Sequence, residues 1–285
     1  MANVYQYPSC SRIGIVEVNV AYRKEVAHYL DLIRTTYTGR TLLDSINNVH
    51  SGIILITPVR NPDDKDHTVN DAYARPANEE DAQQRGTMVS IPIDLGDIGT
   101  INLPGGKIGT GKGSSTIIEY HPATWRQRMK STHRLDPGAG PGEMLFHEAV
   151  HALRNLSGVI DDRTVTANLR MDSSEEFIAV LLTNLYRQER GFKAIRSSHH
   201  GFQATPTPYS FQDVSRGPSG RTISATVEVN PDPNELINPE KYAEFYKVPI
   251  KQFFDSQPVF FLSMAISRVA HNPLAVAAKK MGILL

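Results

Sequence analysis

The chain has 285 residues, 40% of them hydrophobic, and its 30 Lys and Arg are balanced by 30 Asp and Glu. This length suits one large domain or two small ones, and the balanced charge gives no net field favouring nucleic acid or an anionic membrane. A single cysteine, Cys10, excludes a disulfide framework and fits a reducing cytosol.

Two further classes of segment are not expected in this chain. Residues 1–12 lack the basic start and apolar run of a signal peptide. No apolar stretch approaches the roughly 20 residues that a membrane span needs. We therefore expect no membrane span and no cleaved signal peptide.

The N-terminal part alternates strand and helix patterns, which predicts the first half of a mixed sheet. A polar stretch with two prolines follows over 60–86, for which we expect an extended, mobile surface loop. The elements predicted before this loop are a strand at 13–20, a helix at 23–35 broken by Thr38 and Gly39, a short helix at 42–46 and a buried strand at 52–59.

Three more strands are predicted before residue 121, at 88–93, 98–103 and 116–120. We expect the last of them to form the exposed edge of the sheet, where an extended peptide could add as a further strand. Between them, Gly106, Gly111 and Lys112 match the first part of a phosphate-binding loop. Gly113 stands where Ser or Thr should bind Mg²⁺, and a β-rich stretch follows where a helix should open, so a flexible hairpin is favoured.

Residues 143–158 carry the central motif, His147-Glu148-Ala-Val-His151, in an apolar helical pattern that Gly158 is placed to end. The two histidines are four residues apart, so on a helix both imidazoles share one face and can reach one ion. Glu148 lies about 100° around the helix from His147, where it can touch a water on that ion. Two neutral imidazoles leave zinc enough charge to lower the pKa of a bound water to roughly 7.

This motif also arises by chance in proteins without a metal. Here the three ionisable residues interrupt an otherwise apolar helix, and burying such groups without partners costs several kcal/mol. A metal is the simplest explanation.

A catalytic zinc takes three protein ligands and keeps one position open. Metzincins have Gly and His where this chain has Arg154 and Ser157, so that class is excluded. A later helical pattern, 172–186, offers Glu175 and Glu176, which lie 24 and 25 residues after His151. Either could be the ligand, because Ser173 with Glu176 and Asp172 with Glu175 also read as capping boxes. We favour Glu176, since it shares a face with the small residues Ala179 and Thr183.

The remaining segments carry weaker signals. Residues 121–142 are expected to be irregular, and His121 and His133 are not expected to be ligands. Residues 191–233, with His199 and His200, are expected to form a loop-rich wall or lid. Helices are predicted at 239–254, 259–269 and 273–284, with Phe253, Phe254, Phe260 and Phe261 in the core.

The chain resembles the gluzincin effector metallopeptidases that bacteria inject by type III secretion. The resemblance lies in the motif helix, in Leu156-Ser-Gly158 at its end and in Glu175-Glu-Phe177 on a later helix. This family is distantly similar to clostridial neurotoxin light chains. The upstream stretches 38–44, 109–117 and 120–122 also resemble that family. The resemblance covers roughly Gly39 to Tyr186.

By position, the resemblance implies His147, His151 and Glu176 as zinc ligands and Glu148 as general base, with Glu175 as a neighbouring or alternative ligand. Those proteases also stabilise the oxyanion with a later Tyr or Arg, for which Tyr209, Tyr242 and Tyr246 are candidates, as is the loop around His199 and His200.

The sequence thus predicts a single α+β zincin-like domain over 1–285, with a mixed, mostly antiparallel sheet and an HExxH active-site helix. Its expected parts are an N-terminal helix and strand part (1–60), a mobile loop (61–86), a metal-site core (87–190) and a C-terminal helical part (191–285). The expected function is a zinc-dependent endopeptidase, an effector or toxin that a specialised secretion system delivers into the cytosol of a host or rival cell. There it would cut a protein substrate, and a secretion chaperone or apparatus would be its other partner.

Three alternatives stay open from the sequence. The first is a zinc-bearing binding module without protease activity, which the intact Glu148 argues against. The second is a housekeeping peptidase acting on small peptides. The third is a nucleotide-binding protein that would use the loop beginning at Gly106.

Overall fold

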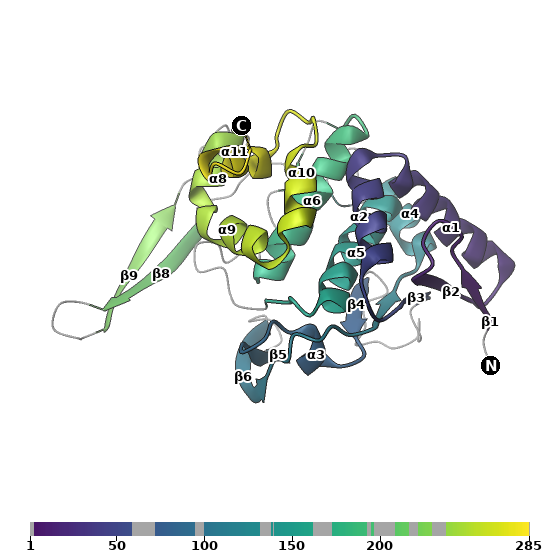
Figure 1. Cartoon of the computed structure of the whole chain (residues 1–285), viewed down its shortest axis with the longest axis horizontal. Helices are drawn as coiled ribbons and strands as arrows, with labels where there is room; N and C mark the ends of the chain where they lie inside the picture. The colour runs from purple at the N-terminus through teal and green to yellow at the C-terminus, as the bar shows by residue number, and fades with distance from the viewer. Residues whose placement is uncertain are drawn as a thin grey trace. The chain divides into compact units, whose positions relative to one another are not determined.

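A computed structural model describes residues 3–58, 72–94, 100–131, 138, 140–161, 173–192, 195–196, 209–216, 222–229 and 238–284 (Figure 1). The chain forms two compact units, Met1–Asp162 and Arg163–Leu285. A single domain over 1–285 stays a prediction. Each unit combines helices and strands, which agrees with the predicted α+β class.

The N-terminal unit is built on a five-stranded sheet in the order β1-β2-β3-β7-β4. The β1–β2 and β4–β7 pairs are antiparallel, whereas β2–β3 and β3–β7 are parallel. The sheet is therefore mixed, as predicted, but it is not mostly antiparallel. Its strands are β1 (Asn3–Gln6), β2 (Ile13–Glu17), β3 (Ile54–Thr57), β4 (Tyr73–Pro76) and β7 (Thr116–Glu119).

Two helices, α1 (Val20–Arg34) and α2 (Tyr37–Asn48), pack against the motif helix α5 (Pro141–Ser157). The predicted break at Thr38 and Gly39 was wrong, because both residues lie inside α2. Thr36 ends the turn between the helices, and its hydroxyl accepts a hydrogen bond from the N–H of Gly39 at 3.0 Å. Glycine is required there because an added Cβ would lie 1.8 Å from the carbonyl oxygen of Ile33.

Strand β7 is not an edge of the five-stranded sheet, whose two edges are β1 and β4, which corrects the prediction for 116–120. Strand β7 lies between β3 and β4. The stretch expected to be a mobile loop, 60–86, contains both β4 and the short helix α3 (Glu79–Ala82). Strand β4 lacks the hydrophobic pattern by which strands are predicted, because its edge residues, such as Tyr73 and Arg75, are largely exposed. Residues 59–71 lie outside the described part.

A separate antiparallel hairpin joins β5 (Met88–Asp94) and β6 (Thr100–Ile108), which confirms the two predicted strands. No helix follows the glycine-rich stretch, because the next element is β7. This arrangement does not support a phosphate-binding loop.

Residues 121–142, expected to be irregular, contain the helix α4 (Pro122–Ser131). Proline suits the first turn of a helix, where its missing N–H would lack an intrahelical partner anyway. Trp125 of α4 is buried, and Arg126 forms an ion pair with Glu25 of α1 at 2.7 Å. His121 is exposed, and His133 lies outside the described residues.

The only cysteine of the sequence is buried in this unit. Cys10 lies in the turn before β2 with 1% of its surface exposed, and its thiol donates to the carbonyl oxygen of Leu43 in α2 at 3.6 Å. Burial raises the pKa of the thiol. Cys10 therefore acts as a small core residue.

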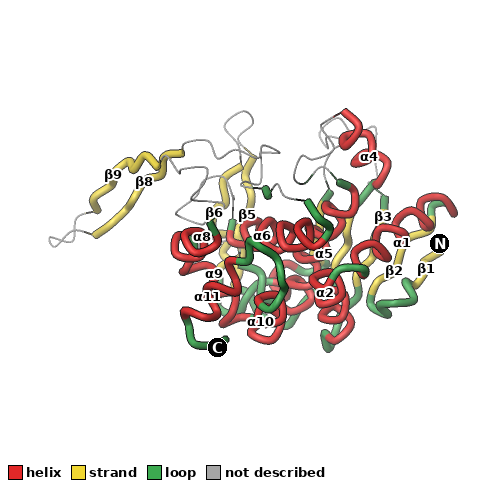
Figure 2. The backbone as a smooth tube through the Cα atoms, turned by 90° about the horizontal axis from the view of Figure 1, so that it is seen from above, coloured by secondary structure: helices red, strands yellow, loops and turns green. Residues whose placement is uncertain are grey.

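The C-terminal unit contains five described helices and one hairpin. The strands β8 and β9 run side by side as an antiparallel ribbon (Figure 2). The segment 191–233, expected to be a loop-rich wall or lid, thus contains a hairpin that the sequence analysis did not predict. His199 and His200 lie outside the described part. The elements are α6 (Ser174–Glu189), β8 (Tyr209–Arg216), β9 (Thr222–Val229), α8 (Pro239–Phe245), α9 (Lys247–Ser256), α10 (Pro258–Ala265) and α11 (Pro273–Lys280).

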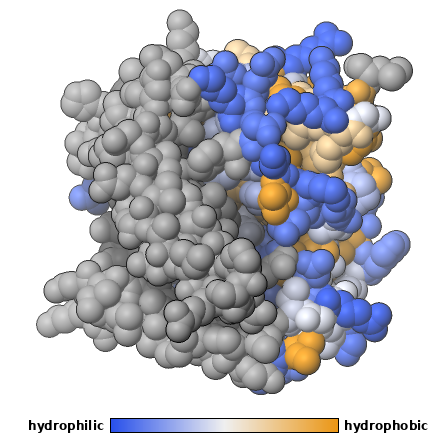
Figure 3. Space-filling view, turned by 90° about the vertical axis from the view of Figure 1, so that its left-hand side faces the viewer, coloured by the Kyte–Doolittle hydropathy of each residue, from blue (hydrophilic) through white to orange (hydrophobic). Residues whose placement is uncertain are grey.

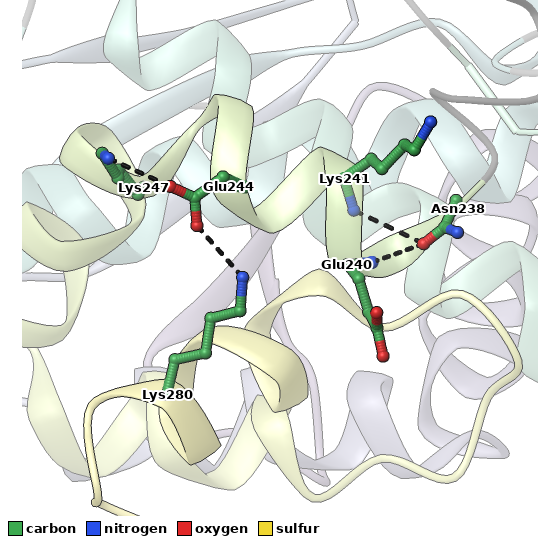
Figure 4. Close-up of polar contacts among 6 residues, drawn as sticks. All are labelled: Asn238, Glu240, Lys241, Glu244, Lys247 and Lys280. Carbon is green, nitrogen blue, oxygen red and sulfur yellow. Dashed lines mark hydrogen bonds and ion pairs between the residues drawn. The ribbon is translucent and has the colours of Figure 1, made fainter.

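Helices α8 to α11 cover the three segments predicted as closing helices, and the first of these segments is divided between α8 and α9. All four phenylalanines expected in the core are buried, namely Phe253, Phe254, Phe260 and Phe261. At the surface, Glu244 of α8 forms ion pairs with Lys247 and Lys280, both at 3.0 Å (Figure 4). The second pair ties α8 to α11.

Hydrophilic and hydrophobic residues are interspersed over the coloured part of the face in Figure 3. The exposed large hydrophobic residues are spread over several elements, from Val4 in β1 to Val259 in α10. No helix among the described residues is long and apolar enough to cross a bilayer.

Candidate metal centre

The motif helix α5 extends over Pro141–Ser157, close to the predicted 143–158. Its first turn has no side-chain cap at Gly140. Instead, the buried Glu143 turns back and accepts a hydrogen bond from the N–H of Gly138 at 2.8 Å. The helix ends at Gly158, whose φ of 67° is the left-handed conformation that favours glycine.

The two motif histidines face each other on one side of α5. His147 and His151 are buried, with 3% and 8% of their surface exposed, and their Nε2 atoms lie 3.1 Å apart. Two nitrogens that each lie roughly 2.0–2.1 Å from one tetrahedral zinc ion are about 3.3 Å apart. The spacing of the pair therefore fits two ligands of the same ion.

Glu148 is buried in the same helix, with 5% of its surface exposed. It follows His147 directly in the chain, and the next two residues, Ala149 and Val150, are also buried. A carboxylate in such surroundings must have partners to remain charged. Glu148 is the residue of this motif that the sequence predicts as the general base.

The candidate third ligand, Glu176, lies in the first turn of α6. Ser173 caps this helix by accepting a hydrogen bond from the N–H of Glu176 at 3.2 Å, which is half of the predicted capping box. His147, His151 and Glu176 each offer a ligand atom within 4.8 Å of the other two. Glu175 is buried but does not belong to this group. The group is therefore a candidate metal site with the ligand set expected from the sequence.

The N-terminal end of α5 is joined to α1 through tyrosines. The hydroxyl of Tyr22 donates to the carbonyl oxygen of Tyr120 at 3.0 Å, and the hydroxyl of Tyr120 donates to the carbonyl oxygen of Pro141 at 2.9 Å. Both rings are buried, and burial raises the pKa of Tyr22. These bonds position the start of the histidine-bearing helix.

The C-terminal end of α5 packs against the glycine-rich stretch that resembled a phosphate loop. The N–H of Ser114 donates to the carbonyl oxygen of Asn155 at 2.9 Å. A Cβ added to Gly113 would lie 2.0 Å from the carbonyl oxygen of Leu156, and one added to Gly158 would lie 2.5 Å from the carbonyl carbon of Gly111. The glycines of this stretch therefore let two backbones approach closely, which explains them without a nucleotide.

Two of the three candidate oxyanion-stabilising tyrosines lie in an aromatic stack. The ring centroid of Phe177 lies 4.4 Å from that of Tyr246 and 6.1 Å from that of Tyr242. Both tyrosines are buried, and burial raises the pKa of Tyr242. The side chain of Tyr209 lies outside the described part of the chain. Sequence reasoning missed Phe177 as a contact of both tyrosines, and its only signal was its place next to Glu176.

A protein-family model, Peptidase M91, described as "Effector protein", matches residues 13–194. The match spans more than half of the chain and includes both motif histidines, Glu148 and Glu176. It also contains the whole stretch, Gly39 to Tyr186, on which the resemblance was based. No match to the chain was found among curated proteins or among solved structures.

Proposed function

The chain belongs to the Peptidase M91 effector protein family, and we propose that it is a zinc-dependent endopeptidase that hydrolyses a peptide bond in a protein of the cell it enters. Membership of this family supports the proposal that the chain is a peptidase and an effector. The metal, the base and the kind of substrate go beyond the family and are argued from the residues.

The observation that carries the proposal is the group of His147, His151 and Glu176, with the two Nε2 atoms 3.1 Å apart. Two imidazoles and one carboxylate are the donor set of many catalytic zinc sites. A fourth coordination position would remain for a water molecule or the substrate. Such an open position separates a catalytic site from a structural one, in which protein usually fills all four positions.

When bound, zinc would supply a lowered pKa for a water molecule and polarise the substrate carbonyl. Glu148 would take the proton of that water through its carboxylate and pass it to the amine of the leaving fragment. His147, His151 and Glu176 would hold the metal. Tyr242 and Tyr246 remain the described candidates for stabilising the oxyanion, with Tyr209 as the third.

We further propose that the substrate adds as an extended strand along β4. In an antiparallel ladder, residues alternate between bonding the partner strand and facing away from it. The N–H of Ala77 bonds the carbonyl oxygen of Ser115 of the stretch leading into β7. The alternation therefore directs the N–H and C=O of Ala74 away from β7, toward an incoming strand. Such main-chain bonding tolerates many substrate sequences.

The family description supports delivery of the protein by a bacterial secretion system. The proposed place of action is the cytosol of a host or rival cell, with a secretion chaperone or the apparatus as a further partner. A zinc-bearing module that only binds a partner is the main rival proposal, and a housekeeping peptidase is the second.

The test measures zinc content and cleavage together. Purified protein and the variants His147→Ala, Glu176→Ala and Glu148→Ala would be compared for bound zinc and for new N-termini generated in a cell lysate. Glu175→Gln is the matched control, since it changes the neighbouring acid that lies outside the group. We expect zinc near one per chain, lost in the first two variants and kept in the other two.

Cleavage should disappear in Glu148→Ala while zinc is retained. Retained cleavage in that variant would remove Glu148 as the base. If the wild-type protein binds zinc but produces no new termini in any lysate, the binding module becomes the better account. Loss of zinc in Glu175→Gln but not in Glu176→Ala would make Glu175, rather than Glu176, the third ligand.

A further inference from the structure

The residue that follows the third ligand is the centre of the aromatic stack in the C-terminal unit. Phe177 is fully buried, and its ring lies 4.4 Å from Tyr246 at an interplanar angle of 30°. It also stacks on Tyr242 at 17° and on Phe253 at 20°. One ring from α8, one from α9 and that of Tyr246 between these two helices thus pack on one ring from the first turn of α6. Aromatic pairs of this kind stabilise a structure beyond the effect of their buried area.

The stack belongs to a closed chain of contacts that begins and ends on α6. Gln188 of α6 exchanges two hydrogen bonds with the backbone of His271, at 2.9 and 2.8 Å. The ring of His271 packs edge-on against Tyr242 at 5.4 Å, and Tyr242 stacks on Phe177. The first and last turns of α6 are therefore held by the same group of residues. A helix held at both ends resists rotation about its axis and sliding along it.

The helix α8, which carries Tyr242, is itself fixed at its start. Asn238 accepts hydrogen bonds from the N–H groups of Glu240 and Lys241, at 2.9 and 3.4 Å (Figure 4). The ion pair of Glu244 with Lys280 adds a link to α11. Tyr242 and Tyr246 thus form a firm support for Phe177.

A metal ligand needs such support, because ligand distances in a working site are held to within about 0.2 Å. Glu176 is only half-buried, and its carboxylate is at the end of a long side chain. Its main chain is fixed by the cap at Ser173 and by its neighbour Phe177. We propose that Phe177, held between Tyr242, Tyr246 and Phe253, is a positioning residue that sets Glu176 for metal binding. This inference rests on the proposed function.

The experiment compares zinc affinity with stability. Phe177→Leu and Tyr246→Leu each remove one ring from the closest pair of the stack, whereas Tyr246→Phe keeps both rings. Phe260→Leu is the matched control, because it makes the same kind of change in the same unit at a ring that packs on Phe261. Zinc affinity would be measured by competition with a chelating dye, and global stability by denaturant unfolding. The absorption of the Co²⁺-substituted protein would report the ligand geometry.

We expect Phe177→Leu and Tyr246→Leu to weaken zinc binding roughly 10-fold or more, in the range seen when a group that orients a ligand is lost. Their Co²⁺ spectra should change as well. Tyr246→Phe and Phe260→Leu should keep the wild-type affinity and spectrum. If Phe177→Leu does not fold, the comparison of Tyr246→Leu with Tyr246→Phe decides.

Wild-type zinc affinity in both leucine variants would overturn the positioning role and leave the proposed function intact. An equal loss of affinity in Phe260→Leu would also overturn it, because the effect would then follow general stability. Absence of zinc from the wild-type protein would overturn the proposed function together with this inference.

Discussion

The two helices that supply the candidate ligands are held in different ways. In the N-terminal unit, α5 is fixed at its C-terminal end by backbone packed on backbone, around Gly113 and Gly158. In the C-terminal unit, α6 is fixed by side chains, namely the Ser173 cap, the ring of Phe177 and the amide of Gln188. The position of α5, which carries two candidate ligands, depends on glycines that have no side chain. The position of α6, which carries one candidate ligand, depends on contacts made by side chains.

This difference predicts opposite sensitivities. A helix set by glycine contacts should be disturbed by any added atom, while substitutions that remove atoms nearby have less effect. A helix set by side chains should be disturbed by truncation. The following predictions test that contrast.

The largest effect is expected for Gly113→Ala. The added methyl group would lie 2.0 Å from the carbonyl oxygen of Leu156, and the backbone φ of 85° is unfavourable for alanine. We expect a loss of roughly 3 kcal/mol or more in the free energy of unfolding, measured with guanidinium chloride. Gly86→Ala is the control, because its φ is 82° but no atom lies within 4 Å of the added group. It should cost only about 1–2 kcal/mol, and equal losses in both variants would show that close packing on α5 is unimportant.

A smaller effect is expected for Ser173→Ala at the start of α6. The change removes the hydroxyl that accepts the N–H of Glu176. Loss of such a cap costs about 1 kcal/mol, to be read from denaturant unfolding. Ser173→Asp keeps an acceptor and should restore most of the stability. An unchanged stability in the alanine variant would mean that the aromatic stack alone fixes this turn.

A small gain is expected for Tyr242→Phe. The hydroxyl of Tyr242 is buried and has no hydrogen-bond partner among the described residues. Removing it should raise stability by roughly 0.5 kcal/mol, since a buried polar group without a partner is unfavourable. Thermal unfolding of this variant beside Tyr246→Phe measures the effect. A clear loss would reveal a partner, such as a bound water, and a loss of cleavage alone would support the oxyanion role.

The smallest effect is expected for Glu244→Gln. Hydrogen bonds from Lys247 and then Lys280 lower the pKa of the Glu244 carboxyl below its ordinary value of 4.5. The stabilisation from a lowered pKa is present above that value and is lost as the pH falls through the folded-state pKa. The wild-type protein should therefore melt slightly above Glu244→Gln at pH 7, and the two melting temperatures should converge in acid. A difference that persists at low pH would exclude the ion pairs as its cause.

The motif helix could be predicted closely, because its signals are local. The spacing of His147 and His151 and the stop at Gly158 act within one helix, and both are confirmed. The choice of Glu176 over Glu175 also agrees with the candidate metal group. In each case a few neighbouring residues determine the geometry.

The predictions that failed share one physical cause, which is that residues distant in the sequence determine the local structure. Strand β4 reads as a polar loop because its order comes from pairing with β7, where Pro76 lies opposite Thr116. Gly39 reads as a helix break, but it lies inside α2, at a point where a side chain would collide with the carbonyl oxygen of Ile33. The sequence argues against a nucleotide loop in the glycine-rich stretch, but the packing of its backbone on the end of α5 could not be predicted, because Gly113 and Leu156 are far apart in the chain. No local sequence pattern predicts that Phe177 stacks on Tyr242 and Tyr246.

Cys10 provides a built-in reporter for the N-terminal unit. A thiol reagent attacks the thiolate, and Cys10 is 1% exposed with its pKa raised by burial. Labelling at that position therefore has to wait until the turn before β2 separates from Leu43. Because the chain contains no other cysteine, the rate of modification counts openings of this unit alone. The rate of local unfolding in this unit can thus be measured at a natural residue, without an engineered label.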